Sequence, residues 1–443
     1  MEALLELVET KQYTSLRQEM EEMNEADIAS FLGELDESDM LKIFRILPKD
    51  LAADVFAYLE LDEQQMIITS LSEKEATNII NNMMSDDAAD LFDEMPSNVV
   101  KKLLAHADPE AHEAIMRLLK YPEDSAGTVM TVEYVDLKEN LTVEQAIERI
   151  RKVGVDSETI NICYVTDSKR TLIGTVALRY LLLSPPDAII GDIMHENVIS
   201  IHTHMDKEEV ARQFQKYDFT VMPVVDNENR IVGIITVDDV IDIIQDEATE
   251  DIEKLTAITP SDKPYLKTNV LSLWKHRIPW LLILMISTTF TSAIILHFES
   301  KLGAYTVLTA FIPMLMGAGG NAGSQTSTTI ACGLSKKELG LRNIFQVIWK
   351  EIRVAVMCGV VMAVVSFGKL LLIERVDVMV AFVVSLTLLF VICVAKIVGV
   401  IMPMLAKTIH LDPAVVATPF ISTVLDALSL LIYFRVAAAF LNL

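Results

Sequence analysis

The chain has 443 residues, enough for two or three domains, and a formal net charge of −25. The charge is unevenly divided: residues 1–250 hold 52 Asp and Glu against 21 Lys and Arg, whereas residues 251–443 hold 10 against 16. An acidic surface repels phosphate, so we expect no nucleic-acid partner and favour cations as ligands.

Residues 1–125 contain a loose repeat, visible in "LPKDLAADVFAYL", "LDEQQMIITSL", "LSEKEATNIINNM" and "MSDDAADLFDEM". Each copy places apolar residues at helical spacing after a polar residue that can cap a helix. A helix this short cannot bury its own apolar stripe, so neighbouring helices must stack. We therefore predict an all-α superhelical N-domain.

Residues 126–248 contain two units of similar content, each with the pattern strand, helix, strand, turn, strand, helix. The doublet resembles a pair of CBS domains. In the second unit, "GIITVDDV" provides Thr236 and Asp239 where nucleotide-binding CBS units place the residues that contact ribose. The first unit has Ala177 and Tyr180 in those places. The resemblance implies an α/β CBS-domain pair and leaves ATP binding open.

The acidic segment "QDEATEDIEKLTAI", residues 245–258, contains no helix-breaking residue before Pro260. We expect it to form a connecting (plug) helix that links the CBS pair to a membrane domain. The expected domains are 1–125 for the N-domain, 126–187 and 188–248 for the two CBS domains, 249–275 for the connecting helix and 276–443 for the transmembrane domain.

Five apolar spans follow, each near or above the roughly 20 residues needed to cross about 30 Å of hydrocarbon. They cover residues 278–298, 303–332, 352–373, 378–402 and 413–434. Lys and Arg gather before span one, between spans two and three, and between spans four and five, whereas the opposite loops carry only Lys301 and Arg375. We therefore expect a five-helix domain in the cell membrane, with cytoplasmic N-terminal domains and the C-terminus outside.

The second span contains "GAGGNAGSQ", with four glycines and the amides of Asn321 and Gln325. Glycine permits unwinding, so backbone carbonyls and amide oxygens could line a wet ion path. Alternatively, Gly319 and Gly323 form a GxxxG motif for close helix packing. Proline near these segments suggests that the second and fifth spans are interrupted. The stretch alone leaves both interpretations open.

Asp426 is a single acid within the otherwise apolar fifth span. A carboxylate in a membrane is costly and normally faces a cavity that serves function. The structural alternative is an ion pair with Lys396 or Arg435. Oxygen ligands suit Mg²⁺, which is usually held by one or two carboxylates plus water. The scarcity of Cys and His in these two spans disfavours a path for soft metals.

Four segments together resemble the MgtE family of magnesium channels: "PMLMGAGGNAGSQTSTT", "DPAVVATPFISTVLDALSLLIYF", "YPEDSAG" and "VDDVIDIIQDEATEDIEKL". The resemblance covers nearly the whole chain in the same order. It implies a homodimer whose pore is built chiefly from spans two and five. It also implies that Asp426 and its twin hold partly or fully hydrated Mg²⁺, and that Asn321 lines the same path.

The resemblance further implies regulatory Mg²⁺ sites in the acidic half. Asp86 and Asp90 lie at i, i+4 on one helix face. The family places them with Asp54 and Asp239. Further regulatory ligands implied by the resemblance are Glu208, Asp218, Asp242, Glu247, Glu250, Asp251 and Asp412. Mg²⁺ bound only by the closed arrangement would stabilise it as cytosolic Mg²⁺ rises.

Other functional classes fit less well. An intramembrane aspartyl protease needs two membrane aspartates, and the chain offers one. A zinc site-2 protease needs HExxH, which the sequence lacks. We therefore expect no enzyme. The rival that remains open is a secondary active transporter of a divalent cation coupled to H⁺ or Na⁺.

Overall fold

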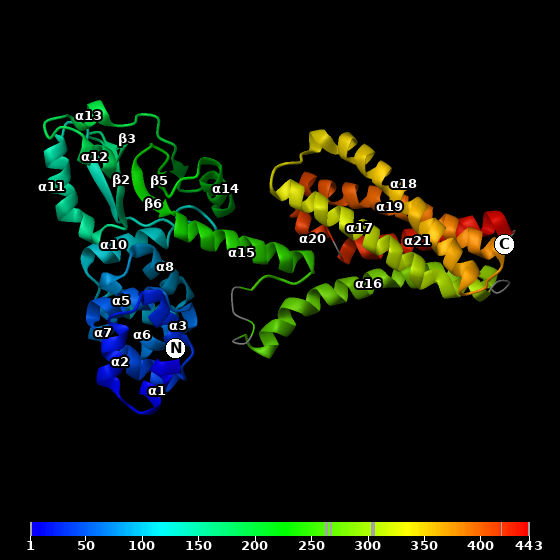
Figure 1. The fold of residues 1–443 in the computed structure, drawn as a ribbon, viewed down its shortest axis with the longest axis horizontal. Coiled ribbons are helices and arrows are strands. Elements are labelled where there is room, and N and C mark those ends of the chain that lie inside the picture. Colours follow the sequence, from blue (N-terminus) through cyan, green and yellow to red (C-terminus); the bar gives the residue numbers. More distant parts are fainter. Residues whose placement is uncertain (1, 262–264, 266–267, 303–305, 418, 442–443) are drawn as a thin grey trace. The chain divides into compact units, whose positions relative to one another are not determined.

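The computed structural model describes residues 2–261, 265, 268–302, 306–417 and 419–441. By contact density the chain divides into two compact units, Met1–Ile244 (unit 1) and Gln245–Leu443 (unit 2). Unit 1 contains short helices followed by two small sheets, and unit 2 contains long helices (Figure 1). The predicted fold class, with a helical N-domain, a CBS pair and a helical transmembrane domain, is confirmed.

Ten short helices form the first part of unit 1 among the described residues. They are α1 (Glu2–Glu9), α2 (Tyr13–Met20), α3 (Glu25–Gly33), α4 (Glu37–Phe44), α5 (Lys49–Ala57), α6 (Leu61–Ser70), α7 (Glu73–Asn82), α8 (Ser85–Glu94), α9 (Ser97–Leu104) and α10 (Pro109–Leu118). Polar caps set several of the starts. The Asp36 carboxylate accepts the backbone N–H of Asp39 at 2.9 Å, and Ser72 and Glu75 form a reciprocal capping box.

Two three-stranded sheets follow, each with a parallel and an antiparallel pair. The first CBS unit contains β1 (Tyr134–Lys138), α11 (Val143–Val153), η1 (Gly154–Asp156), β2 (Thr159–Thr166), β3 (Leu172–Ala177) and α12 (Leu178–Leu183). The second contains α13 (Ile190–Ile193), β4 (Ile201–His202), α14 (Lys207–Tyr217), β5 (Val221–Val225), β6 (Ile231–Thr236) and α15 (Val237–Leu255). This repeated order matches the internal doublet of the sequence.

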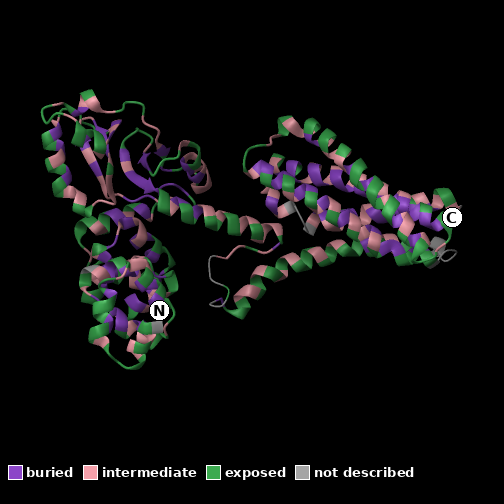
Figure 2. Ribbon diagram, viewed as in Figure 1, coloured by how far each residue is buried: buried purple, intermediate pink, exposed green. Residues whose placement is uncertain are grey.

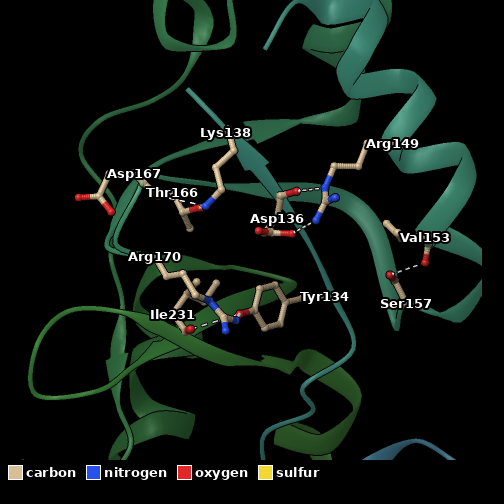
Figure 3. A network of polar contacts seen from close by, with 10 residues as sticks. All are labelled: Tyr134, Asp136, Lys138, Arg149, Val153, Ser157, Thr166, Asp167, Arg170 and Ile231. Carbon is tan, nitrogen blue, oxygen red and sulfur yellow. Dashed lines mark hydrogen bonds and ion pairs between the residues drawn. The ribbon is translucent and has the colours of Figure 1, made fainter. Parts of the chain in front are cut away.

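Polar contacts stabilise the first sheet and join it to the second CBS unit (Figure 3). Within the first sheet, the ammonium group of Lys138 donates to the hydroxyl oxygen of Thr166 at 2.7 Å. Across the two CBS units, the hydroxyl of Tyr134 donates to the backbone oxygen of Ile231 at 3.2 Å. Within the first CBS unit, Arg170 donates to the Tyr134 oxygen at 3.3 Å. The two CBS units are therefore held together by hydrogen bonding as well as by apolar contact.

The N-domain and the second CBS unit share one hydrophobic core. The same buried cluster contains Phe31 and Leu91 from the short helices and Met222, Ile235 and Val240 from the second CBS unit. Figure 2 shows buried residues running through both regions. A shared core fixes the position of α8 relative to the start of α15, which matters for the acidic site described below.

The described part of unit 2 is built from long helices joined by short ones. They are α16 (Val270–Leu302), η2 (Thr306–Phe311), α17 (Ile312–Ser335), η3 (Leu341–Asn343), α18 (Ile344–Leu372), α19 (Val378–Thr408), α20 (Pro413–Ala417) and α21 (Pro419–Leu441). Helix α19 is packed against α17, α18 and α21, and is the most buried of them (Figure 2). The first core cluster of this unit includes Leu315, Val384 and Tyr433.

Among the described residues, four helices are long and apolar enough to cross a membrane, at Val270–Phe298, Leu341–Leu372, Val378–Thr408 and Phe420–Leu441. Helix α17 has 24 residues, a sufficient length, but its glycine, amide and hydroxyl residues lower its hydropathy. It corresponds to the second predicted span. The five expected spans thus have five long helical counterparts.

The connecting helix differs from the prediction at both ends. It begins inside the second CBS unit as α15 and ends at Leu255, before Pro260. Ala257 adopts a left-handed conformation with φ of 56°, which cannot continue an α-helix. The helix therefore ends without the help of proline. Residues 262–264 and 266–267 of the expected segment lie outside the described residues.

Candidate functional site

Helix α17 has two different faces, and its glycines lie on the packed one. A Cβ atom at Gly319 would lie 2.6 Å from the hydroxyl oxygen of Ser429, and one at Gly323 would lie 2.1 Å from Cδ1 of Leu425. On α19, a Cβ atom at Gly399 would lie 2.6 Å from the backbone oxygen of Gly323. Glycine alone permits helix contacts this close. Packing therefore explains these glycines.

Another face of α17 carries a polar row, which we call the polar face. Its members follow helical spacing and are Asn321, Ser324, Gln325, Thr328, Thr329 and Cys332. They line an open groove of about 700 Å³. Apart from the Cys332 thiol, these side chains present amide and hydroxyl groups, whose oxygens can bind water or a hard cation. Asn321 thus lies in the groove, as a lining role requires.

The predicted interruption of α17 is wrong. The helix runs continuously from Ile312 to Ser335, through all four glycines. Pro313 lies in its first turn, where the missing N–H costs no helical hydrogen bond. The backbone carbonyls of the glycine stretch therefore belong to the helix, and side chains line the groove. In the fifth span, α20 ends at Ala417 and α21 begins at Pro419.

Asp426 lies on α21, half-buried, directly after Leu425, which packs against Gly323. Neither of its proposed basic partners pairs with it: Lys396 contacts Glu351 instead, and Arg435 is exposed. The structural alternative for this acid is therefore not realised among the described residues. Asp426 does not border the polar groove of a single chain, so the structure does not bring it together with Asn321 there.

Unit 1 contains an acidic pocket of about 430 Å³ between the short helices and the CBS pair. Its acidic lining residues are Glu25, Asp54, Asp86, Asp87, Glu158, Asp238, Asp239 and Asp242. None of the described lining residues is basic. Such a concentration of carboxylates, with no basic residue among the described lining, is unfavourable unless protons or cations neutralise it.

Four of the acids predicted from the sequence line this pocket: Asp54, Asp86, Asp239 and Asp242. Asp90 lies outside the lining, although it remains within electrostatic reach of Asp239. The prediction missed four others, which are Glu25, Asp87, Glu158 and Asp238. Asp87 and Asp238 are sequence neighbours of predicted ligands and could have been included. Glu25 and Glu158 come from distant segments, and no local pattern marks them.

Crowding of these carboxylates raises their pKa values. Loss of hydration, followed by repulsion from Asp239, raises the pKa of Asp87 to about 7. Burial, then repulsion from Asp87, raises the pKa of Asp86 well above its ordinary value. One carboxylate oxygen of Asp86 is buried without a hydrogen-bond partner among the described residues. A bound cation would therefore reduce the repulsion among the carboxylates of this pocket.

Within the described residues, no three Asp, Glu, His or Cys side chains are placed to bind a metal ion directly. Facing carboxylates repel one another in the absence of a cation, which favours this separation. The residues fit a cation in charge and in oxygen chemistry. They fit an ion that keeps its water shell better than one bound directly by several carboxylates.

The other predicted regulatory ligands lie apart from the pocket. Glu208 pairs with Arg212, and Asp218 ends α14 in a left-handed conformation. In unit 2, Glu250 and Asp412 both contact the ammonium group of Lys254, at 2.6 and 3.0 Å. A lysine thus already bridges two predicted metal ligands. The remaining two, which lie on α15, are Glu247 and Asp251.

The nucleotide-type residues of the second CBS unit are paired with each other. The Thr236 hydroxyl donates to the Asp239 carboxylate at 2.6 Å. Asp239 also lines the acidic pocket. One carboxylate therefore stands at both the predicted ribose position and the predicted regulatory cation site.

Comparison with known proteins decides the family. Residues 312–436 match the family model MgtE, described as a divalent cation transporter, residues 23–124 match the MgtE intracellular N domain, and residues 190–246 match the CBS domain. The magnesium transporter MgtE of Thermus thermophilus is 40% identical over 76% of this chain and 74% of its own length. The chain belongs to the MgtE family.

Further relatives of this MgtE-family chain agree. The magnesium transporter MgtE of Bacillus subtilis is 35% identical over 76% of the chain and 74% of its own length. Unit 1 also resembles a solved structure described as the cytosolic domain of the Mg²⁺ channel MgtE in complex with ATP. That structure is 36% identical, has a TM-score of 0.52, and the match covers 54% of this chain and 98% of that chain.

Proposed function

We propose that this chain carries Mg²⁺ across the membrane as a channel, along the polar face of α17. The observation that carries the proposal concerns α17 in the membrane unit. Its glycine face packs against neighbouring helices, whereas its polar face lines an open groove. Such a row of amides and hydroxyls is unfavourable against lipid and favourable beside water and a hard cation. The relatives named as magnesium transporters support Mg²⁺ as that cation.

The proposed assembly is a homodimer. A single chain leaves the polar groove open, and a second copy would enclose it away from lipid. Symmetry would place two Asp426 carboxylates around one path, which matches the one or two carboxylates by which Mg²⁺ is usually held. By the positive-inside rule, the acidic unit lies in the cytoplasm and the C-terminus outside.

The proposed regulation is closure by cytosolic Mg²⁺ at the acidic pocket. A liquid-like water occupies about 30 Å³, so six waters around an ion need roughly 180 Å³. The pocket of about 430 Å³ therefore has room for a hydrated Mg²⁺. A closed arrangement that alone binds the ion gains stability as its concentration rises. Binding of ATP at the second CBS unit is part of the same proposal, because a relative binds it in its cytosolic domain.

Proteoliposome flux of Mg²⁺ tests the path. Asp426→Asn and Asp426→Ala are expected to lower flux at least tenfold while the dimer remains folded, because the path loses its charged ligands. Glu338→Gln, which changes an exposed acid in the loop between α17 and α18, is the matched control and should transport normally. Unchanged flux in both Asp426 variants would exclude the proposed path.

The same preparation separates a channel from a coupled transporter. A channel should give Mg²⁺ uptake that ignores imposed H⁺ and Na⁺ gradients, and should give single-channel currents in bilayers. Uptake that follows one of those gradients would instead favour the secondary active transporter.

A further inference from the structure

A second charged group lies inside the membrane unit and has no part in the proposed path. Lys396, on α19, has only 8% of its side chain exposed. Its ammonium group contacts the Glu351 carboxylate on α18 at 3.4 Å and the Thr326 hydroxyl on α17 at 3.1 Å. Thr326 in turn donates to Glu351 at 3.0 Å. The three residues form a closed network across three helices.

This network lies beside the polar face. Thr326 is buried and directly follows Gln325, which lines the groove. A Cβ atom at Gly399, one turn from Lys396 on α19, would lie 3.0 Å from the Cβ of Thr326. The α17 backbone therefore approaches α19 closely within one turn of Lys396, whose ammonium group carries a positive charge. Unpaired, that charge would repel a divalent cation on the polar face, because burial weakens screening.

We propose that Glu351 is the fixed counter-charge of Lys396, and that it cancels the positive charge that would otherwise repel a divalent cation on the polar face, while Thr326 joins the pair to α17. Glu351, Lys396 and Thr326 are positioning residues in this inference, since none of them lines the groove. The inference rests on the proposed transport along α17. It assigns to two residues outside the path a role in how strongly the path attracts Mg²⁺.

The decisive variants change the charge without emptying the site. An unpaired buried lysine can lose its proton, so Lys396→Arg is introduced to keep the charge fixed. The double variant Lys396→Arg with Glu351→Gln leaves one net positive charge. Lys396→Gln alone leaves Glu351 unpaired and gives one net negative charge while that carboxylate is ionised, so flux is measured at alkaline pH. The double variant Lys396→Gln with Glu351→Gln leaves none, and Lys396→Arg alone is the matched control that retains the pair.

The readout is the Mg²⁺ concentration that gives half-maximal flux in proteoliposomes. The net-positive variant should raise it on the order of tenfold, the effect of a unit charge on a divalent ion through partly screened protein. The net-negative variant should lower it, and the neutral double variant and the Lys396→Arg control should stay within about twofold of the unmodified chain. A dye-based thermal melt of each variant reports folding.

Opposite shifts from opposite charges support the inference, because a purely structural role would impair both unbalanced variants in the same direction. Equal losses in both, or no change in either, would overturn it. Failure of the proposed function is distinguishable, since it appears as unchanged flux in the Asp426 variants, which leave this network intact.

Discussion

At the scale of single residues, Asp87 shows how repulsion among the acids of the pocket affects the stability of the folded state. Its carboxylate is partly buried, and the acids around it raise its pKa to about 7. An aspartate in an unfolded chain titrates near 4. The folded state therefore binds more protons than the unfolded state between these values, and its stability falls as the pH rises through about 7.

We predict that residues 1–258, expressed alone and freed of divalent ions, melt at a higher temperature at pH 5.5 than at pH 8. Solved structures of the corresponding part of relatives support use of this segment. Added Mg²⁺ should raise the melting temperature more at pH 8, where the carboxylates are charged. A difference of 1 kcal/mol corresponds to roughly 2–4 °C at this size. Circular dichroism measures it.

The variant Asp87→Asn should show a flatter dependence on pH, because asparagine has no proton to lose. Asp156→Asn, an exposed change in η1 outside the pocket, should follow the unmodified segment. Equal melting temperatures at both pH values, with no effect of Mg²⁺, would contradict a pocket that demands cations.

Single residues also mark where sequence reasoning stops. Asp426 stood out because one acid in an apolar run needs no partner to be noticed. Glu25 and Glu158 reach the pocket only through folding of distant segments. The pairing of Lys396 with Glu351 likewise depends on which faces of α18 and α19 meet, which hydropathy does not specify.

At the scale of elements, the contact between α17 and α19 depends on two glycines. We predict that Gly399→Ala separates these helices, because its Cβ would lie 2.6 Å from the Gly323 backbone oxygen. Overpacking of this kind costs about 1–3 kcal/mol. The variant should melt at a lower temperature in detergent and carry less Mg²⁺.

Gly317→Ala is the matched control, because no atom lies within 4 Å of the Cβ it would add. It should melt at or slightly above the temperature of the unmodified chain, since alanine favours helix. Equal effects of the two substitutions would show that the close contact is unimportant.

Elements were the most predictable level of this structure. Periodic apolar residues with polar caps predicted the short helices, and the internal doublet predicted the two sheets. The prediction that α17 unwinds was wrong because glycine can have two effects on a helix. It loosens a helix that has space around it, but it also lets packed helices approach, and here α19 and α21 fill that space.

At the scale of the whole molecule, the acids are concentrated in residues 1–250, and the proposed function assigns sensing to that part and transport to the rest. We predict that a chain lacking residues 1–250 still carries Mg²⁺ but no longer closes when internal Mg²⁺ is high, because the acidic pocket is removed. Flux at clamped internal Mg²⁺ measures this. Asp426→Asn in the shortened chain must still block flux, which shows that the path is the same. Closure retained after the deletion would place the sensor in unit 2.

One consequence follows from the backbone contact of Gly323 with Gly399. At this point no side chain separates the two helices, so there is little room for either to turn or slide. Rotation of α17 about its own axis would drive the Gly323 carbonyl toward α19, so the proposed path along α17 would have a stiff wall. If the proposed path is stiff, we expect it to close at its ends. Lys254, which pairs with Glu250 and Asp412, joins the end of α15 to the turn before α20 and is one place where such closure could act.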